Sequence, residues 1–280
     1  MRQALSSDDQ PIAVHDLGPG ARPTLLCHAT GFNGGAWGPL AAALGDGFDR
    51  WAMDFRAHGS SRLVDGAPLE WTSMRDDVLA VVDELDVEPG TLLGLGHSMG
   101  GCALVLAEQA RPGTFAGLWL FEPVIAPWAQ VSADLAGANP LAEGAARRRA
   151  SFPSFDAALA NYAGKRPLST LRADALDAYV RSGFEEGDDG QVHLRCRPEH
   201  ESAVFRASSG NDAFERLGEL GCPVRVTKGG DEVGVAAFAA GVAEAIPQGT
   251  LEERLHLGHF GPLEAPAELA TSIRAFADGL

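Results

Sequence analysis

Cysteine is scarce in this chain of 280 residues, which contains only four. The four lie far apart and form neither a Cys-x-x-Cys pair nor another zinc-ligand spacing, so the sequence predicts no metal site built on cysteine. Cys27 and Cys102 lie within apolar segments, where a free cysteine behaves as a small buried side chain. We therefore expect reduced thiols, including Cys196 and Cys222, rather than a disulfide framework.

Basic residues are in the minority, because 22 lysines and arginines stand against 38 aspartates and glutamates, a formal net charge of −16. Nucleic acid and anionic membrane surfaces repel such an excess of carboxylates, so the composition argues against both as partners. Such a charge is typical of a protein that self-repulsion keeps in solution.

Long apolar runs are missing as well. No segment has the uninterrupted apolar length of a transmembrane helix, and residues 1–10 are polar where a secretory signal would carry an apolar core. Together with the expected reduced thiols, these absences predict a cytoplasmic protein.

Short apolar runs alternate with longer segments of helical periodicity along most of the chain. This alternation is typical of a mostly parallel sheet covered by helices, the α/β class. The expected strands are 11–15, 24–27, 48–53, 91–95, 117–121, 223–227 and 250–255, and helices are expected at 99–110, 232–245 and 267–277. The length fits one large domain, or a domain with an insertion.

The segment 123–211 interrupts this alternation. It contains helix-like pieces at 155–163, 173–184 and 199–207, joined by links rich in glycine, proline and aspartate, and no strand repeat. We interpret it as a helical lid inserted into a core domain formed by residues 1–122 and 212–280. A second independent domain is the alternative, since the length would just permit one.

Polar residues follow several of the expected strands: His28, Asp54, Ser98, Glu122 and the turn 229–231. Functional residues of such sheets lie beyond the carboxyl ends of the strands. We therefore expect these residues to converge at one edge of the sheet.

The turn after the strand at 91–95 carries the most specific pattern, Gly96-His97-Ser98-Met99-Gly100. Ser98 lies at a strand-to-helix junction, where glycines two positions before and after it permit a sharp, strained turn. That turn exposes the hydroxyl and aims the first helical amides at the atom it attacks. Ser98 is therefore the predicted nucleophile. The glycines lack the βαβ context of a dinucleotide fingerprint, so we expect no cofactor.

With four further segments, the chain resembles the α/β-hydrolase superfamily over nearly its full length. The segments are HATGF at 28–32, DFRAHGSS at 54–61, GGD at 229–231 and GHFGPLE at 258–264. The resemblance implies the α/β-hydrolase fold with a helical lid after the sixth strand, and a catalytic triad in the chain order serine, acid, histidine.

In this sequence the resemblance assigns Ser98 as the nucleophile and His259 as the base that accepts its proton. Asp231, after the strand expected at 223–227, is the preferred acid, which would hold the imidazole in one tautomer. Glu122 is the alternative, because some relatives carry the acid after the preceding core strand. Glu232 is expected as a carboxylate in the first turn of a helix.

The resemblance also assigns the oxyanion hole to the backbone N–H groups of Met99 and Thr30, with Ala29 a weaker candidate for the second donor. Ala29 stands where the family commonly has glycine, and its Cβ narrows the loop. The motif from Asp54 through Arg56 to His58 resembles a structural turn that braces loops behind the active site.

A short basic run, Arg147 to Arg149, lies in the expected lid. Such a run is usually a solvated helix face. The functional alternative is attraction of an anionic substrate.

These features predict a serine hydrolase that cleaves a small-molecule carboxylic ester, thioester or lactone through an acyl-enzyme intermediate, without a cofactor or metal. One alternative is a carbon–carbon bond hydrolase, acyltransferase or lyase on the same site, because fold does not determine function. The other is a small-molecule binding or signalling protein with slow turnover.

Overall fold

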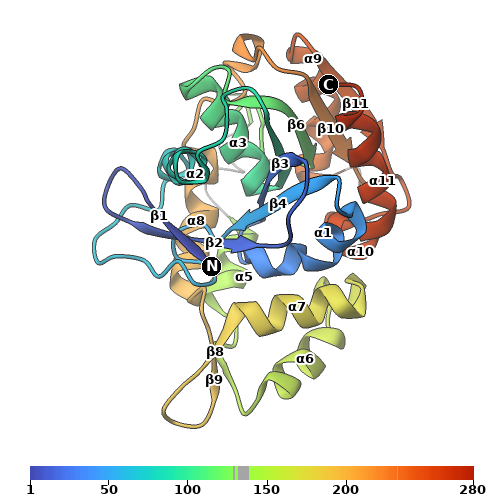
Figure 1. Cartoon of the computed structure of the whole chain (residues 1–280). Helices are drawn as coiled ribbons and strands as arrows, with labels where there is room; N and C mark the ends of the chain where they lie inside the picture. Colours follow the sequence, from blue (N-terminus) through green and yellow to red (C-terminus); the bar gives the residue numbers. More distant parts are fainter. Residues whose placement is uncertain (129, 132–138, 232) are drawn as a thin grey trace.

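The computed structural model describes residues 1–280 except 129, 132–138 and 232 (Figure 1). Its main sheet has eight strands in the order β1-β2-β4-β3-β5-β6-β10-β11. From β4 to β11 all neighbours pair in parallel, whereas β1 and β2 extend one edge in antiparallel pairing. The strands are β1 (Arg2–Leu5), β2 (Pro11–Asp16), β3 (Arg22–Cys27), β4 (Phe48–Met53), β5 (Leu92–His97), β6 (Phe115–Phe121), β10 (Val224–Lys228) and β11 (Gly249–Glu253).

The predicted α/β class with a mostly parallel sheet is confirmed. Strand β1 was not predicted from the sequence. Only Ala4 of its four residues is buried, so the strand carries no apolar alternation that a sequence reader could recognise.

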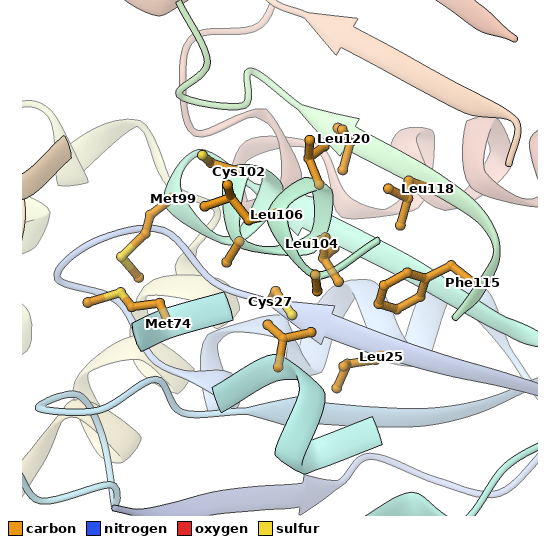
Figure 2. Close-up of a cluster of buried hydrophobic side chains, with 14 of the residues drawn as sticks. Leu25, Cys27, Met74, Met99, Cys102, Leu104, Leu106, Phe115, Leu118 and Leu120 are labelled. Carbon is orange, nitrogen blue, oxygen red and sulfur yellow. The ribbon is translucent and has the colours of Figure 1, made fainter. Parts of the chain in front are cut away.

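Helices cover both faces of the sheet. Successive residues of a strand point to opposite faces, so Leu25 belongs to the core on one face and Leu26 to the core on the other. The first core, part of which Figure 2 shows, lies under α2 (Trp71–Leu85), α3 (Met99–Ala110) and α9 (Ala239–Ala245). The second lies under α1 (Gly38–Leu44) and α11 (Pro266–Ala277).

The segment between β6 and β10 contains helices and a small second sheet. Its helices are α5 (Pro140–Ala146), α6 (Phe155–Ala163), α7 (Ala173–Gly183) and α8 (Pro198–Arg206). The strands β7 (Ser151–Phe152), β8 (Phe184–Glu186) and β9 (Val192–Leu194) pair antiparallel in the order β7-β9-β8. The expectation of helices alone is therefore wrong, because strands of two or three residues are too short to show a period of two.

The helix expected at 232–245 is also shorter than predicted. A 3₁₀ helix, η5 (Gly234–Phe238), precedes α9, and Glu232 lies outside the described residues. Within the described ranges, no helix combines the length and the apolar character that crossing a bilayer would require.

Candidate active site

Ser98 connects β5 to α3 in a strained conformation. Its φ of 55° and ψ of −116° lie in a region that residues with a Cβ rarely adopt. Neighbouring backbone holds this geometry, because the Ser98 N–H donates to the Phe121 carbonyl at 3.0 Å and the Ser98 carbonyl accepts from the Val124 N–H at 3.2 Å. The predicted sharp turn at Ser98 is present.

The two glycines that flank this turn are required by close packing. A Cβ on Gly96 would lie 2.5 Å from the Cα of Gly101, and a Cβ on Gly100 would overlap the carbonyl of Cys27. Neither position can carry a larger residue unless backbone moves. The pattern read from the sequence therefore has a direct steric cause.

His259 lies in the loop after β11, and its backbone is tied to the residue beside Ser98. The His97 Nε2–H donates to the carbonyl of His259 at 2.7 Å, and the two imidazole centroids are 4.9 Å apart. Burial lowers the pKa of His97, so this imidazole is neutral and acts as a fixed donor. His97 thus anchors the loop that carries the predicted base.

The carboxylate that reaches His259 is that of Glu122. The Nδ1 of His259 donates to Glu122 Oε2 at 2.6 Å, and Glu122 Oε1 accepts from the Gly229 N–H at 2.8 Å. Glu122 directly follows β6, is 1% exposed and has a φ of 43°. With Nδ1 protonated by this contact, Nε2 carries the lone pair that a general base needs.

The preference for Asp231 is therefore corrected by the geometry. Asp231 is exposed, and none of the hydrogen bonds in the described part of the chain joins it to His259. The loop after β10 turns at Gly230, before Asp231, where the Gly230 N–H donates to the Leu257 carbonyl at 2.9 Å. This turn aims the Gly229 amide, rather than the Asp231 carboxylate, at the site.

Register brings Ser98 and Glu122 to one edge of the sheet. His97 pairs with Phe121 across β5 and β6, so the residues after each strand leave the sheet at neighbouring positions. Thr227 of β10 pairs with Phe121 on the other side, which places the Gly229 turn next to Glu122. The convergence expected at the carboxyl ends of the strands is present.

Thr30 and Met99 lie together beside the turn. The Thr30 hydroxyl donates to the Met99 sulfur at 3.4 Å, which joins the two loops predicted to form the oxyanion hole. The next two amides of the first loop are occupied, since Gly31 donates to His58 Nε2 and Phe32 donates to the Ala29 carbonyl. Among the described residues, the Thr30 and Met99 N–H groups have no acceptor, which leaves both available to a ligand.

Two buried histidines shape the first of these loops. His28 accepts from the Phe55 N–H and donates to the Ala29 carbonyl, while His58 accepts from Gly31 and donates to the Arg56 carbonyl. Burial lowers the pKa of His28 to about 4 and that of His58 to about 3. Both are neutral at physiological pH and serve as fixed hydrogen-bonding groups.

The turn that follows β4 braces this arrangement. Asp54 accepts from the N–H groups of Gly34 and Ser60 and from His15. Arg56 is fully buried and binds the carboxylates of Asp8 and Asp77. These contacts are structural, as expected from the sequence. Within the described residues, no three His, Cys, Asp or Glu side chains gather as a metal site would require.

Comparison with known proteins gives the same architecture. A human monoglyceride lipase is 35% identical over 128 residues, which cover 43% of this chain and 42% of that protein, less than half of its length. The crystal structure of E-2-(acetamidomethylene)succinate hydrolase superposes with a TM-score of 0.82 at 20% identity and covers 99% of this chain and 98% of that one. Esterase RhEst1 from Rhodococcus sp. ECU1013 gives 0.75 at 22% identity, covering 100% and 98%.

A family model described as "Alpha/beta hydrolase family" matches residues 24–272. The match runs from strand β3 into helix α11 and includes Ser98, Glu122 and His259. The chain belongs to the alpha/beta hydrolase family.

Proposed function

We propose that the protein is a serine hydrolase that cleaves a small-molecule carboxylic ester, thioester or lactone with the triad Ser98, His259 and Glu122. The observation that carries this proposal is the hydrogen bond from His259 Nδ1 to the buried Glu122 carboxylate. A binding protein needs no such arrangement of strained serine, oriented imidazole and desolvated acid.

The reaction begins when Nε2 of His259 accepts the proton of the Ser98 hydroxyl as its oxygen attacks the substrate carbonyl. Negative charge develops on the former carbonyl oxygen, and the N–H groups of Met99 and Thr30 donate to it. One such donor contributes about 3 kcal/mol to stabilisation of the transition state. Glu122 stabilises the imidazolium that forms on His259.

Collapse of the tetrahedral intermediate breaks the bond to the leaving group, which takes the proton from His259. An acyl group then remains on Ser98. A water molecule gives its proton to His259 and attacks the acyl carbon, and the second collapse releases the acid and returns the proton to Ser98. The proposed chemistry uses only residues of the chain and water, with segment 123–211 as a lid over the substrate.

The test is labelling with a fluorophosphonate, followed by kinetics on 4-nitrophenyl esters of graded chain length. We expect the probe to modify the peptide that contains Ser98, and Ser98→Ala to lose label and at least about 10⁴ of kcat. Ser169→Ala removes an exposed hydroxyl of the segment between β6 and β10 and should behave as the parent. Equal rates of ester hydrolysis by Ser98→Ala and the parent would show that Ser98 is not the nucleophile.

A further inference from the structure

Arg148 differs sharply from its neighbours in the basic run at 147–149. Its side chain is 19% exposed, whereas that of Arg147 is 72% exposed. The solvated-face interpretation therefore applies to Arg147 but not to Arg148. A guanidinium is placed inside a protein only where groups are present to pair with it.

The guanidinium of Arg148 lies among three polar side chains. Nη1 donates to Glu201 Oε2 at 2.5 Å, and Nη2 donates to the hydroxyls of Tyr162 at 3.1 Å and Tyr179 at 2.5 Å. The residues come from three helices, because Tyr162 lies on α6, Tyr179 on α7 and Glu201 on α8. We call these four residues the arginine cluster.

The arginine cluster has more donors than acceptors. An arginine side chain has five N–H groups, and Arg148 uses three of them in these contacts. Both tyrosine hydroxyls accept from Arg148, yet within the described ranges neither donates its own proton. Burial raises the pKa of the Tyr179 phenol, which therefore keeps its proton. Two N–H groups and two O–H groups thus remain for another acceptor.

The arginine cluster borders the loop that carries Thr30. A Cβ added to Gly31 would collide with the Glu201 carboxylate and lie 3.2 Å from Arg148 Nη1. Gly31 directly follows Thr30, the proposed oxyanion donor. The guanidinium and Glu201 therefore lie beside the residue that follows the proposed oxyanion donor.

Aromatic rings connect the cluster to the triad. The centroid of Tyr179 is 4.9 Å from that of Phe32, Phe32 is 5.2 Å from Phe260, and Phe260 is 5.4 Å from His259. Helix α7 is fixed on this loop, because Asn33 donates to the Tyr179 carbonyl at 3.1 Å. A continuous series of packed rings thus runs from the arginine cluster to the predicted base.

Glu201 does not exhaust the capacity of Arg148 for carboxylates. Arg56 of the same chain binds two carboxylates at once, because Nε and Nη2 donate to Asp77 while Nη1 and Nη2 donate to Asp8. The planar fork of a guanidinium presents separate edges to separate carboxylates. In Arg148 both Nη2 hydrogens go to the tyrosine hydroxyls, so a further carboxylate would accept singly from the Nε–H or from the second Nη1–H, together with the tyrosine O–H groups.

We infer that Arg148, with the hydroxyls of Tyr162 and Tyr179, binds a carboxylate carried by the substrate, so that the enzyme prefers esters bearing a free carboxylate near the scissile carbonyl. This inference rests on the proposed serine hydrolase function and adds its substrate class. Glu201 holds the guanidinium in place and neutralises it when no substrate is bound.

The experiment compares kcat/KM within matched pairs of charged and neutral esters, with spontaneous hydrolysis subtracted; the first two pairs are 4-nitrophenyl esters. The glutaric and adipic acid monoesters carry a carboxylate on the acyl chain, and the pentanoate and hexanoate are neutral counterparts. The butyrate esters of 3-hydroxybenzoate and of phenol place the carboxylate on the leaving group instead. For each pair, kcat/KM of the charged ester is divided by kcat/KM of the neutral ester. The pair with the larger quotient identifies which half of the substrate faces Arg148.

We expect the parent to favour the charged member of one pair by at least about tenfold, and Arg148→Gln to lose this preference. Arg147→Gln makes the same change of charge at an exposed position and should keep the preference. Tyr179→Phe removes one donor and keeps the ring, and it should reduce the preference through a higher KM for the charged ester. Thermal unfolding verifies that each variant is folded.

If Arg148→Gln fails to fold, inhibition of the parent by glutarate against neutral glutaramide, and the loss of that inhibition in Tyr179→Phe, give the same answer. A parent with no preference for either charged ester, or a preference that Arg148→Gln retains, overturns the inference. Hydrolysis of the neutral esters and labelling of Ser98 report on the triad separately, so failure of the proposed function is recognised independently.

Discussion

Glu122 and His259 are 137 positions apart in the chain and are joined by a hydrogen bond of 2.6 Å. The proposed acid thus follows β6, and the turn after β10 contributes a backbone amide, from Gly229, that donates to the second carboxylate oxygen. Both oxygens of a carboxylate that is 1% exposed are engaged, which fixes the side chain on His259. The tautomer of the proposed base depends on this contact.

Replacing Glu122 with glutamine should strongly reduce catalysis. The amide oxygen of Gln can still accept from Gly229, which leaves the NH₂ group facing His259 where an acceptor is needed. The imidazole would then be held in the wrong tautomer, a change that lowers kcat by about 10⁴ in serine protease triads. We expect a loss of at least about 10² in kcat on 4-nitrophenyl butyrate.

Asp231→Asn is the matched control, because it makes the same carboxylate-to-amide change at the acid that the sequence favoured. Asp231 is exposed, so kcat should remain at the level of the parent. A large loss of kcat in Asp231→Asn, together with an active Glu122→Gln, would identify Asp231, in the turn after β10, as the triad acid.

Adding a methyl group at Gly100 should damage both stability and activity. The new Cβ would overlap the Cys27 carbonyl, so either β3 or the first turn of α3 must move. Such overpacking costs about 1–3 kcal/mol in the free energy of unfolding, and the movement displaces the Met99 amide. Urea denaturation and kcat on a 4-nitrophenyl ester measure the two effects.

Gly241→Ala controls for the change of residue type. Gly241 lies within α9 and has no neighbour within 4 Å of an added Cβ. Alanine is favoured over glycine in a helix interior by about 0.5–1 kcal/mol, so this variant should be as stable as the parent or more stable. If Gly100→Ala equals Gly241→Ala in stability, the close approach of α3 to β3 is not as described.

Local sequence was sufficient for the features whose cause is local. The turn at Ser98 depends on Gly96 and Gly100, which lie within two positions of it, and α3 begins and ends where its apolar pattern predicts. The choice between Asp231 and Glu122 depends instead on how the loop after β10 folds back on Leu257. No local pattern specifies that contact.

The same distinction explains Arg148. Three consecutive arginines look alike in the sequence, and only the packing of α6, α7 and α8 separates the partly buried Arg148 from its exposed neighbours. Short strands such as β7 could not be predicted from the sequence for a related reason, since two residues define no period. Tertiary contacts, rather than propensity, decide both.

Two of the buried histidines, His28 and His58, should make stability depend on pH. Burial holds the folded pKa of His28 at about 4 and that of His58 at about 3, below the ordinary value of 6.5. Below pH 6.5 the unfolded chain therefore binds protons that the folded protein does not, so acid favours unfolding. Each histidine contributes a slope of up to about 1.4 kcal/mol per pH unit between 6.5 and its folded pKa.

His58→Gln isolates one of these contributions. The Gln Oε1 can accept from the Gly31 N–H as His58 Nε2 does, while the titrating group is gone. Urea denaturation from pH 4.5 to 8.5 should give a shallower loss of stability in the variant below pH 6.5, by up to about 1.4 kcal/mol per pH unit. Above pH 7.5 both states of the parent hold His58 neutral, so the two curves should run parallel there. Curves that are parallel over the whole range would mean that His58 can take up a proton in the folded protein, and that its ring is not confined between Gly31 and the Arg56 carbonyl.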